Sequence, residues 1–262
     1  MTDNANDVIW QQIREEAKRE AEFEPALASF LYTVVLSHEL LEDALSYILA
    51  SKLGCTTVNA LTLRDLINAV FSKDLKVCTA FRADLQAVLS RDPACCGYLI
   101  PLLYFKGFQA LQAYRVANYY FVNNRKALAY HIQSRVSEVF AVDIHPGARI
   151  GKGILFDHAT SVVVGETAVV DDDCSLLHEV TLGGTGKDSG DRHPKVHRGV
   201  MIGAGAKILG NIVIGEGAKI GSGSVVLKDV PPHCTVAGVP ARQVGAPTCD
   251  LPALEMDQSL EL

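Results

Sequence analysis

Two Asp–His groupings lie close together in the second half of the 262-residue chain: Asp143 with His145, and Asp157 with His158. An imidazole titrates near neutral pH and can take a proton from a hydroxyl group. An acidic partner such as Asp143 could hold the opposite ring nitrogen and stabilise the imidazolium. The grouping therefore favours a general base at His158 over the alternative of a solvated surface histidine.

A polar segment from Gly186 to Lys195 carries a second set of charged side chains, including Asp188, Arg192 and His193. A guanidinium can clamp a small carboxylate through two parallel hydrogen bonds, which makes Arg192 a candidate for substrate binding. The simpler interpretation is a mobile polar loop.

Two glycine-containing turns suggest where an extended ligand could lie. Gly183-Gly184-Thr185 and Gly203-Ala204-Gly205 lack bulky side chains, so a ligand could approach their backbone amides. Lys207, Lys219 and Lys228 could supply cations to a phosphorylated cofactor, although solvated lysines give the same pattern. We also considered zinc bound by His145, His158 and His178, but their spacing matches no zinc site, so no metal is expected.

The elements that would position these residues repeat every six positions. Small aliphatic residues, usually followed by Gly or Asp, lead each hexad, and three hexads close a triangular coil of about 18 residues in a parallel β-helix. The leaders are Ile144, Ile150, Phe156, Val164, Val170, Leu176, Leu182, Val196, Ile202, Ile208, Ile214, Ile220 and Val226. Ordinary hairpins would need Asn-Gly-like turns, which are missing here.

The six-residue register breaks twice, and the candidate residues lie at the breaks. Two extra residues fall between Phe156 and Val164, next to His158, and eight extra residues fall between Leu182 and Val196. Insertions at the corners of such coils often carry the binding face. His178 follows Leu176 as His158 follows Phe156, so it is expected to stack one coil from His158.

The composition limits the class of protein. Hydrophobic residues make up 48% of the chain, and the net charge of −6 gives no electrostatic footprint for nucleic acid or an anionic membrane. There is no signal-peptide pattern and no apolar run of about 20 residues that would span a membrane. Seven scattered cysteines without a C-x-x-C pair suggest reduced thiols in a cytoplasmic protein.

Residues 1–140 are rich in Ala, Leu, Glu, Arg and Gln, which is typical of helices. The chain is therefore predicted to be α+β with segregated domains: a helical domain (1–140), a left-handed parallel β-helix (141–247) and a flexible acidic tail (248–262). Helices are expected to begin near Val8, at Pro25, near Thr62, after Asp74 and after a cap at Asp92. The helix from Pro25 is expected to end before Gly54. Two further helices are expected from Tyr98 to Tyr120 and from Asn124 to Phe140. β-Helices of this kind usually associate side by side, commonly as trimers, with sites in the grooves between prisms.

Several strings in the chain are much more specific than the repeat. DIHPGARIG, FDHATSVVVGETAVV, VTLGGTGKDSGDRHPKV, GVMIGAGAKILGN and AGVPAR resemble the serine O-acetyltransferase family, as does RDPA in the helical half. The resemblance implies transfer of acetyl from acetyl-CoA to the hydroxyl of L-serine, which gives O-acetyl-L-serine and CoA in cysteine biosynthesis.

The resemblance also implies roles for individual residues. His158 would be the general base and Asp143 its partner. Asp92, Asp157, Arg192 and His193 would bind the amino acid, and L-cysteine would bind in the same pocket as a feedback inhibitor. The acetyl-CoA contacts would be Gly184, Thr185, Ala204, Gly205, Lys219, Ser222 and Arg242.

The family further implies partners. Its helical half builds a dimer of trimers, and its C-terminal tail enters the active site of O-acetylserine sulfhydrylase. That tail typically ends in Ile, whereas this chain ends in Leu262, so we expect the complex to form but to be weaker. A zinc carbonic anhydrase-like solenoid and a non-catalytic scaffold remain the alternative functions.

Overall fold

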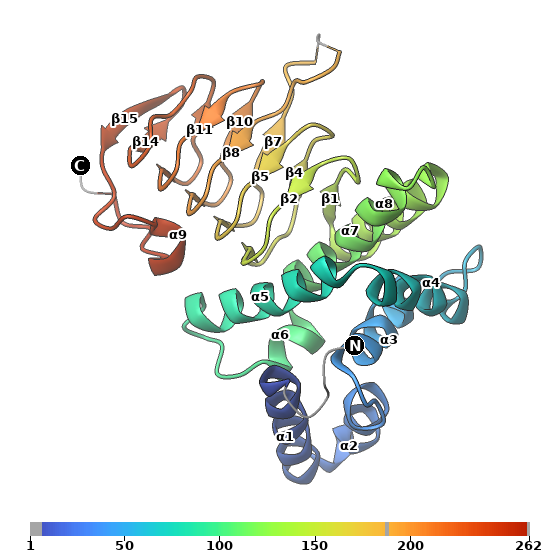
Figure 1. Ribbon diagram of the computed structural model, residues 1–262. Coiled ribbons are helices and arrows are strands. Elements are labelled where there is room, and N and C mark those ends of the chain that lie inside the picture. Colours follow the sequence, from blue (N-terminus) through green and yellow to red (C-terminus); the bar gives the residue numbers. More distant parts are fainter. Residues whose placement is uncertain (1–6, 187–188, 261–262) are drawn as a thin grey trace.

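The computed structural model describes residues 7–186 and 189–260, so Asp188 and Leu262 lie outside the described residues. A set of helices forms one end of the molecule and a stack of short strands forms the other (Figure 1). The helices are α1 (Val8–Phe23), α2 (Pro25–Leu31), the π-helical turn η2 (Tyr32–Leu36), α3 (Leu41–Leu53), α4 (Ala60–Lys73), α5 (Leu75–Arg91), α6 (Leu99–Tyr104), α7 (Lys106–Val122) and α8 (Lys126–Phe140).

Side-chain caps explain where several helices begin. Asp7 accepts a hydrogen bond from the backbone of Trp10 at the start of α1, and Asp74 accepts one from Lys76 at the start of α5. Asn59 caps α4 through the Thr62 backbone, so this helix begins earlier than the Thr62 signal suggested. Each cap satisfies a backbone N–H that has no partner within its helix.

Three of the helices expected from the sequence are divided, interrupted or absent in the structure. The helix expected from Pro25 to Gly54 is divided into α2, η2 and α3, and the helix expected from Tyr98 to Tyr120 is interrupted at Phe105. Asp92 does not start a helix: it ends α5, and its Oδ1 accepts a hydrogen bond from the Ala94 backbone in a tight turn. Asp followed by Pro fits a turn as well as a helix start, so the sequence could not separate them.

The predicted parallel β-helix is confirmed, and it has three sheets. Sheet A has the order β1-β4-β7-β10-β13, sheet B has the order β11-β8-β5-β2, and sheet C has the order β15-β14-β12-β9-β6-β3. The strands are β1 (Val142–Ile144), β2 (Arg149–Ile150), β3 (Leu155–Phe156), β4 (Val162–Val164), β5 (Val169–Val170), β6 (Ser175–Leu176), β7 (Thr181–Gly183), β8 (Lys195–Val196), β9 (Met201–Ile202), β10 (Lys207–Leu209), β11 (Val213–Ile214), β12 (Lys219–Ile220), β13 (Val225–Val226), β14 (Thr235–Gly238) and β15 (Ala241–Gly245).

The strand register follows the hexads, and nearly all of the aliphatic leaders are buried inside the prism. Phe156 pairs with Leu176, and Leu176 pairs with Ile202, so each leader stacks on the leader of the next coil. Val196 pairs with Ile214 eighteen residues later, the expected coil length. The coils that contain the two insertions are longer, and their extra residues leave the prism at its corners.

Helix α8 joins the two halves. It ends at Phe140, Ala141 adopts a left-handed conformation with φ 55°, and β1 begins at Val142. The ranges 1–140, 141–247 and 248–262 remain a prediction of how the chain divides into domains. No helix within the described residues is long and apolar enough to cross a lipid bilayer.

Part of the described C-terminal segment packs back onto the molecule. Strand β15 pairs antiparallel with β14, and the short helix α9 (Pro252–Glu255) follows it. Ala253 is fully buried, and its carbonyl accepts a hydrogen bond from Ser175 Oγ in β6. The sequence did not predict helix α9, because a four-residue helix is too short to give a periodic signal.

Candidate functional site

One corner of the prism, which we call the His158 edge, consists of the turns that join sheet C to sheet A (157–161, 177–180, 203–206 and 221–224). His158 lies here with its side chain 75% exposed and its Nε2 3.8 Å from Asp157 Oδ1. The ring of His178 lies one coil away, with 5.8 Å between ring centroids, as the hexad count predicted. A solvent-open imidazole beside a carboxylate can accept a proton from a bound hydroxyl group.

The turn that carries His158 is held in an unusual backbone conformation. His158, Ala159 and Ser161 all have positive φ values between 55° and 59°, which non-glycine residues rarely adopt. Hydrogen bonds fix both sides of the turn: Ser161 N donates to Ala141 O at 2.7 Å, and Glu179 N donates to Thr160 O at 2.7 Å. Such a conformation persists only where its surroundings impose it, and it is commonly found at functional sites.

Helix α7 approaches this turn closely. A Cβ atom at Gly107 would lie 2.1 Å from the carbonyl oxygen of Phe156, so only glycine allows the helix to pack here. The ammonium of Lys106 donates to the hydroxyl of Thr160 in the same turn. The helical half therefore helps to position His158.

Asp143 lies in the middle of β1, and its side chain points outward from sheet A because its neighbours Val142 and Ile144 are buried. Its Oδ1 accepts a hydrogen bond from Gln133 Nε2 at 2.7 Å. No hydrogen bond joins Asp143 to His158 in the described structure, so the expected pair is not formed in this single chain. Asp143 does share the sheet that begins directly after the His158 turn.

A second corner, the Arg192 edge, consists of described residues that lie between strands of sheet A and sheet B (145–148, 165–168, 184–186 and 189–194). Arg192 Nη2 lies 2.8 Å from Glu166 Oε2, and the hydrogen bond from Arg192 keeps the pKa of Glu166 below its usual value. His193 is buried, with its Nδ1 2.9 Å from Thr167 Oγ1. Burial, and then the positive charge of Arg192, lower the pKa of His193.

His145 also lies at the Arg192 edge, but its side chain has a structural role. The ring packs edge-on against Phe121 and Tyr130, and its Nδ1 accepts a hydrogen bond from the Gly147 backbone. Burial lowers the pKa of His145, which keeps the ring neutral. No group of three His, Cys, Asp or Glu side chains among the described residues could hold a metal ion.

The two edges are separated by the full width of sheet A. His158 precedes β4 of this sheet, whereas Arg192 follows β7. A three-residue strand spans on the order of 10 Å, so the two side chains flank the sheet from opposite sides. A single chain therefore does not bring the predicted base and the predicted carboxylate clamp together.

Asp92 comes from the helical half. The turn after α5 contains Cys95, which packs against Leu155 of β3. Because β3 leads directly into Asp157 and His158, this turn lies on the side of the molecule that carries the His158 edge.

The residues expected to contact acetyl-CoA are divided between the two edges. Ala204, Gly205 and Ser222 lie in the turns stacked beyond His158, and Gly184 and Thr185 lie at the Arg192 edge. Arg242 is exposed on β15.

Lys219 is not the free cation that the sequence suggested. It is buried, and its Nζ donates to Ser259 O at 2.6 Å and lies 3.6 Å from Asp257 Oδ2. The C-terminal segment therefore covers this position in the structure. This contact could not be predicted from the sequence, because it joins residues 40 positions apart.

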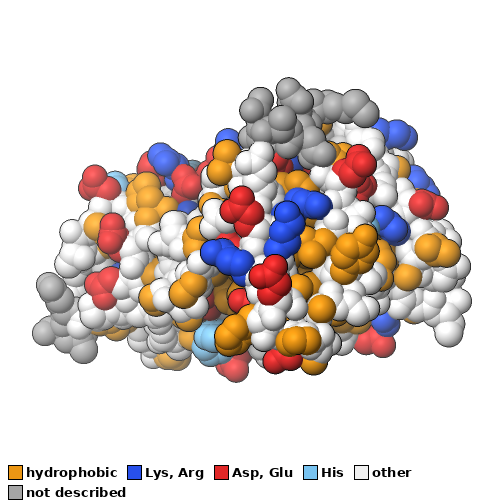
Figure 2. Space-filling view, turned by 90° about the horizontal axis from the view of Figure 1, so that it is seen from below, with side chains coloured by type: hydrophobic (Ala, Val, Ile, Leu, Met, Phe, Trp, Pro, Cys, Tyr) orange, Lys and Arg blue, Asp and Glu red, His pale blue; other side chains and the backbone are white. Residues whose placement is uncertain are grey.

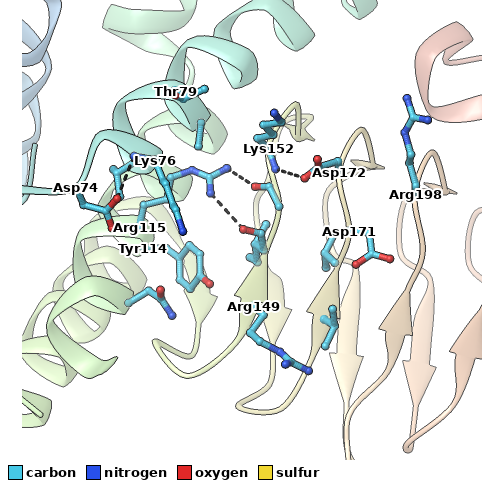
Figure 3. A pocket seen from close by; sticks show the side chains of 17 residues that line it. Asp74, Lys76, Thr79, Tyr114, Arg115, Arg149, Lys152, Asp171, Asp172 and Arg198 are labelled. Atoms are coloured by element: carbon cyan, nitrogen blue, oxygen red, sulfur yellow. Dashed lines mark hydrogen bonds between the residues drawn. The ribbon is translucent and has the colours of Figure 1, made fainter. Parts of the chain in front are cut away.

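A large cavity lies elsewhere, between α5 and sheet B, with a volume of about 1070 Å³ (Figure 3). Basic side chains such as Arg149 and Lys152 line it together with acidic ones such as Asp171 and Asp172. Neither His158 nor Arg192 lines it, so the size of the cavity alone does not mark the candidate site.

The outer surface of the helical half presents hydrophobic side chains. Phe23 is 87% exposed, and Val8, Leu27, Phe30 and Tyr32 of the same region are also exposed. The face seen from below shows hydrophobic side chains among both acidic and basic ones (Figure 2).

Comparison with known proteins agrees with the sequence motifs. Residues 9–113 match the family "Serine acetyltransferase, N-terminal", and residues 193–228 match "Bacterial transferase hexapeptide (six repeats)". A serine acetyltransferase of Salmonella typhimurium is 56% identical over 252 residues, which cover 96% of this chain and 92% of the relative.

Solved structures are similar over nearly the whole chain. A serine acetyltransferase in complex with cysteine has a TM-score of 0.95 and 53% identity, covering 98% of this chain and all of that one. The Brucella abortus serine acetyltransferase in complex with coenzyme A has a TM-score of 0.92 and 50% identity, covering 94% of this chain and 98% of that one.

Proposed function

This chain belongs to the serine acetyltransferase family of acyltransferases, and from that premise we propose that it transfers acetyl from acetyl-CoA to the hydroxyl of L-serine with His158 as the general base. His158 takes the proton of the serine hydroxyl as its oxygen attacks the thioester carbonyl. The C–S bond then breaks, and the imidazolium returns the proton to the CoA sulfur. The products are O-acetyl-L-serine and CoA.

The observation that carries this proposal is the exposed imidazole of His158 beside Asp157 on a constrained turn. Asp143 would hold the opposite ring nitrogen and stabilise the imidazolium once the ring turns toward sheet A. General-base catalysis of this kind contributes about 10²–10⁴-fold to a rate.

The amino-acid pocket requires a second chain. Arg192 and His193 cannot reach His158 of their own chain across sheet A, so we propose that the Arg192 edge of a neighbouring prism completes the site. Arg192 would bind the serine carboxylate, with Glu166 orienting its guanidinium. Asp92 and Asp157 would receive the ammonium group. L-cysteine carries the same two charged groups, which supports its binding in this pocket as a feedback inhibitor.

The same groove would hold acetyl-CoA. Ala204, Gly205 and Ser222 line the His158 edge with small side chains, and Gly184 and Thr185 of the neighbouring chain would face them. Lys219 could contact the cofactor only after exchanging its bonds to Ser259 and Asp257. Arg242 would contribute an exposed cation nearby.

We also propose the assembly and the partners. The exposed hydrophobic side chains of α1, α2 and η2 support an association of two trimers through the helical half. The C-terminal tail would bind O-acetylserine sulfhydrylase. The described cysteines are free thiols, which fits a cytoplasmic enzyme.

The direct test of this function measures CoA release from acetyl-CoA with L-serine for the wild type and for His158→Ala. The variant should lose at least about 100-fold in turnover, the usual contribution of a general base. Wild-type turnover in this variant would refute the mechanism. Parallel assays with other hydroxy amino acids define the acceptor.

A further inference from the structure

The junction between the two halves brings helix α8 against the strand that carries Asp143. The left-handed conformation of Ala141 reverses the chain, and its backbone N–H donates to Ser137 O at 3.0 Å. Strand β1 then runs back along α8. As a result Gln133, ten residues earlier in the sequence, lies against Asp143.

The contact between these two side chains is short and specific. Gln133 Nε2 donates to Asp143 Oδ1 at 2.7 Å, and both side chains are half-buried. Within the described structure Asp143 Oδ2 has no hydrogen-bond partner. A carboxylate held at one oxygen in this way presents the other oxygen in a fixed direction.

The same junction also touches the His158 turn. The carbonyl of Ala141 accepts the hydrogen bond from Ser161 N that closes the turn. One short segment, from Gln133 to Asp143, therefore carries the proposed acidic partner and contacts the turn that carries His158.

We propose that Gln133 is a positioning residue for acetyl transfer, which holds the Asp143 carboxylate so that Oδ2 faces the imidazole of His158. The inference rests on the proposed function, because it needs Asp143 to act on His158. An amide donor stabilises the carboxylate as an anion and cannot itself exchange a proton with His158 at neutral pH. Gln133 would not touch serine or acetyl-CoA.

The test replaces Gln133 while keeping its size. Gln133→Leu removes the donor, and we expect kcat to fall about tenfold, which corresponds to roughly 1.4 kcal/mol, with KM for acetyl-CoA unchanged within about twofold. Gln133→Glu places a second carboxylate beside Asp143 and should lose more. Ser134→Ala, at the exposed neighbouring position of α8, is the matched control and should keep wild-type kcat.

A double-mutant cycle separates positioning from a general effect on folding. Because Gln133 is proposed to act through Asp143, Gln133→Leu should have little further effect on kcat in an Asp143→Asn background. The thermal midpoint of each variant is measured alongside. An equal loss from Gln133→Leu in both backgrounds would overturn the inference, since the residue would then act elsewhere.

The remaining outcomes are distinguishable. If Asp143→Asn lowers kcat but Gln133→Leu does not, the inference fails and the proposed function stands. If Asp143→Asn keeps wild-type kcat, the role proposed for Asp143 fails and the inference fails with it.

Discussion

A buried carboxylate that ties the helices to the β-helix provides a stringent test of the fold. Asp84 of α5 has no exposed surface and accepts four hydrogen bonds. Arg115 donates from Nη2 at 2.7 Å and from Nε at 3.1 Å, Gln112 donates at 3.0 Å, and the Ile154 backbone donates at 3.0 Å. Because Ile154 belongs to the first coil, Asp84 connects both halves of the molecule.

Asp84→Asn keeps the shape of the side chain but leaves the buried Arg115 guanidinium without its counter-ion. Breaking one partner of a buried ion pair costs about 3–5 kcal/mol. For a chain of this size, roughly 2–4 °C of thermal midpoint are lost per kcal/mol, so the midpoint should fall on the order of 6–20 °C. Differential scanning calorimetry and urea titration measure the effect.

Glu138→Gln is the matched control. This change also removes the carboxylate that pairs with an arginine, Arg135. Glu138 is 68% exposed, however, and an exposed ion pair contributes at most about 1 kcal/mol to the free energy of unfolding. If Asp84→Asn changes the midpoint no more than Glu138→Gln does, the claim that this network joins the two halves is wrong.

Two further predictions concern the two edges. Arg192→Ala should raise KM for serine and weaken cysteine binding while leaving acetyl-CoA affinity unchanged; a loss confined to acetyl-CoA would contradict the pocket. The same change should raise the pKa of His193, seen by NMR titration, because a nearby positive charge is lost. Gly107→Ala should destabilise the protein by about 1–3 kcal/mol and lower turnover, since its Cβ would collide with Phe156 O. At Gly245, where no atom lies within 4 Å of an added Cβ, alanine should have little effect, and equal effects at both positions would refute this reasoning.

The β-helix could be predicted from the sequence because the six-residue pattern that defines it is local and is repeated along the chain. Each leader, such as Ile202 or Ile220, occupies the same position in successive coils, so the period alone defines the stacking. The two register breaks also marked the turns of His158 and of Arg192. The breaks in the helices could not be predicted in this way, because the apolar pattern continues through Phe105, where the backbone leaves the helical conformation in the structure.

The residues of the candidate site could be predicted from the sequence, but their positions relative to one another in space could not. Motif resemblance selected His158, Asp143 and Arg192, yet it did not indicate that sheet A separates the first from the last. Gln133 carries no signal in the sequence, because its contact with Asp143 depends on the left-handed backbone at Ala141. The contacts of Lys219 could not be predicted for the same reason: its partners lie 38 and 40 residues away and meet it only in the fold.

The central claim is that His158 of one chain works with Arg192 of its neighbour, and mixed assemblies test it directly. His158→Ala and Arg192→Ala chains are co-expressed with different tags and purified as mixed oligomers. They are assayed at a serine concentration far below the raised KM of the Arg192 variant, so that each parent variant has little activity alone. In a cyclic trimer with equal mixing, about a quarter of the sites would combine an intact His158 with an intact Arg192. Activity should therefore return to about a quarter of the wild-type value. Mixed oligomers no more active than the two parent variants would contradict the claim, because both residues would then serve the same site within one chain.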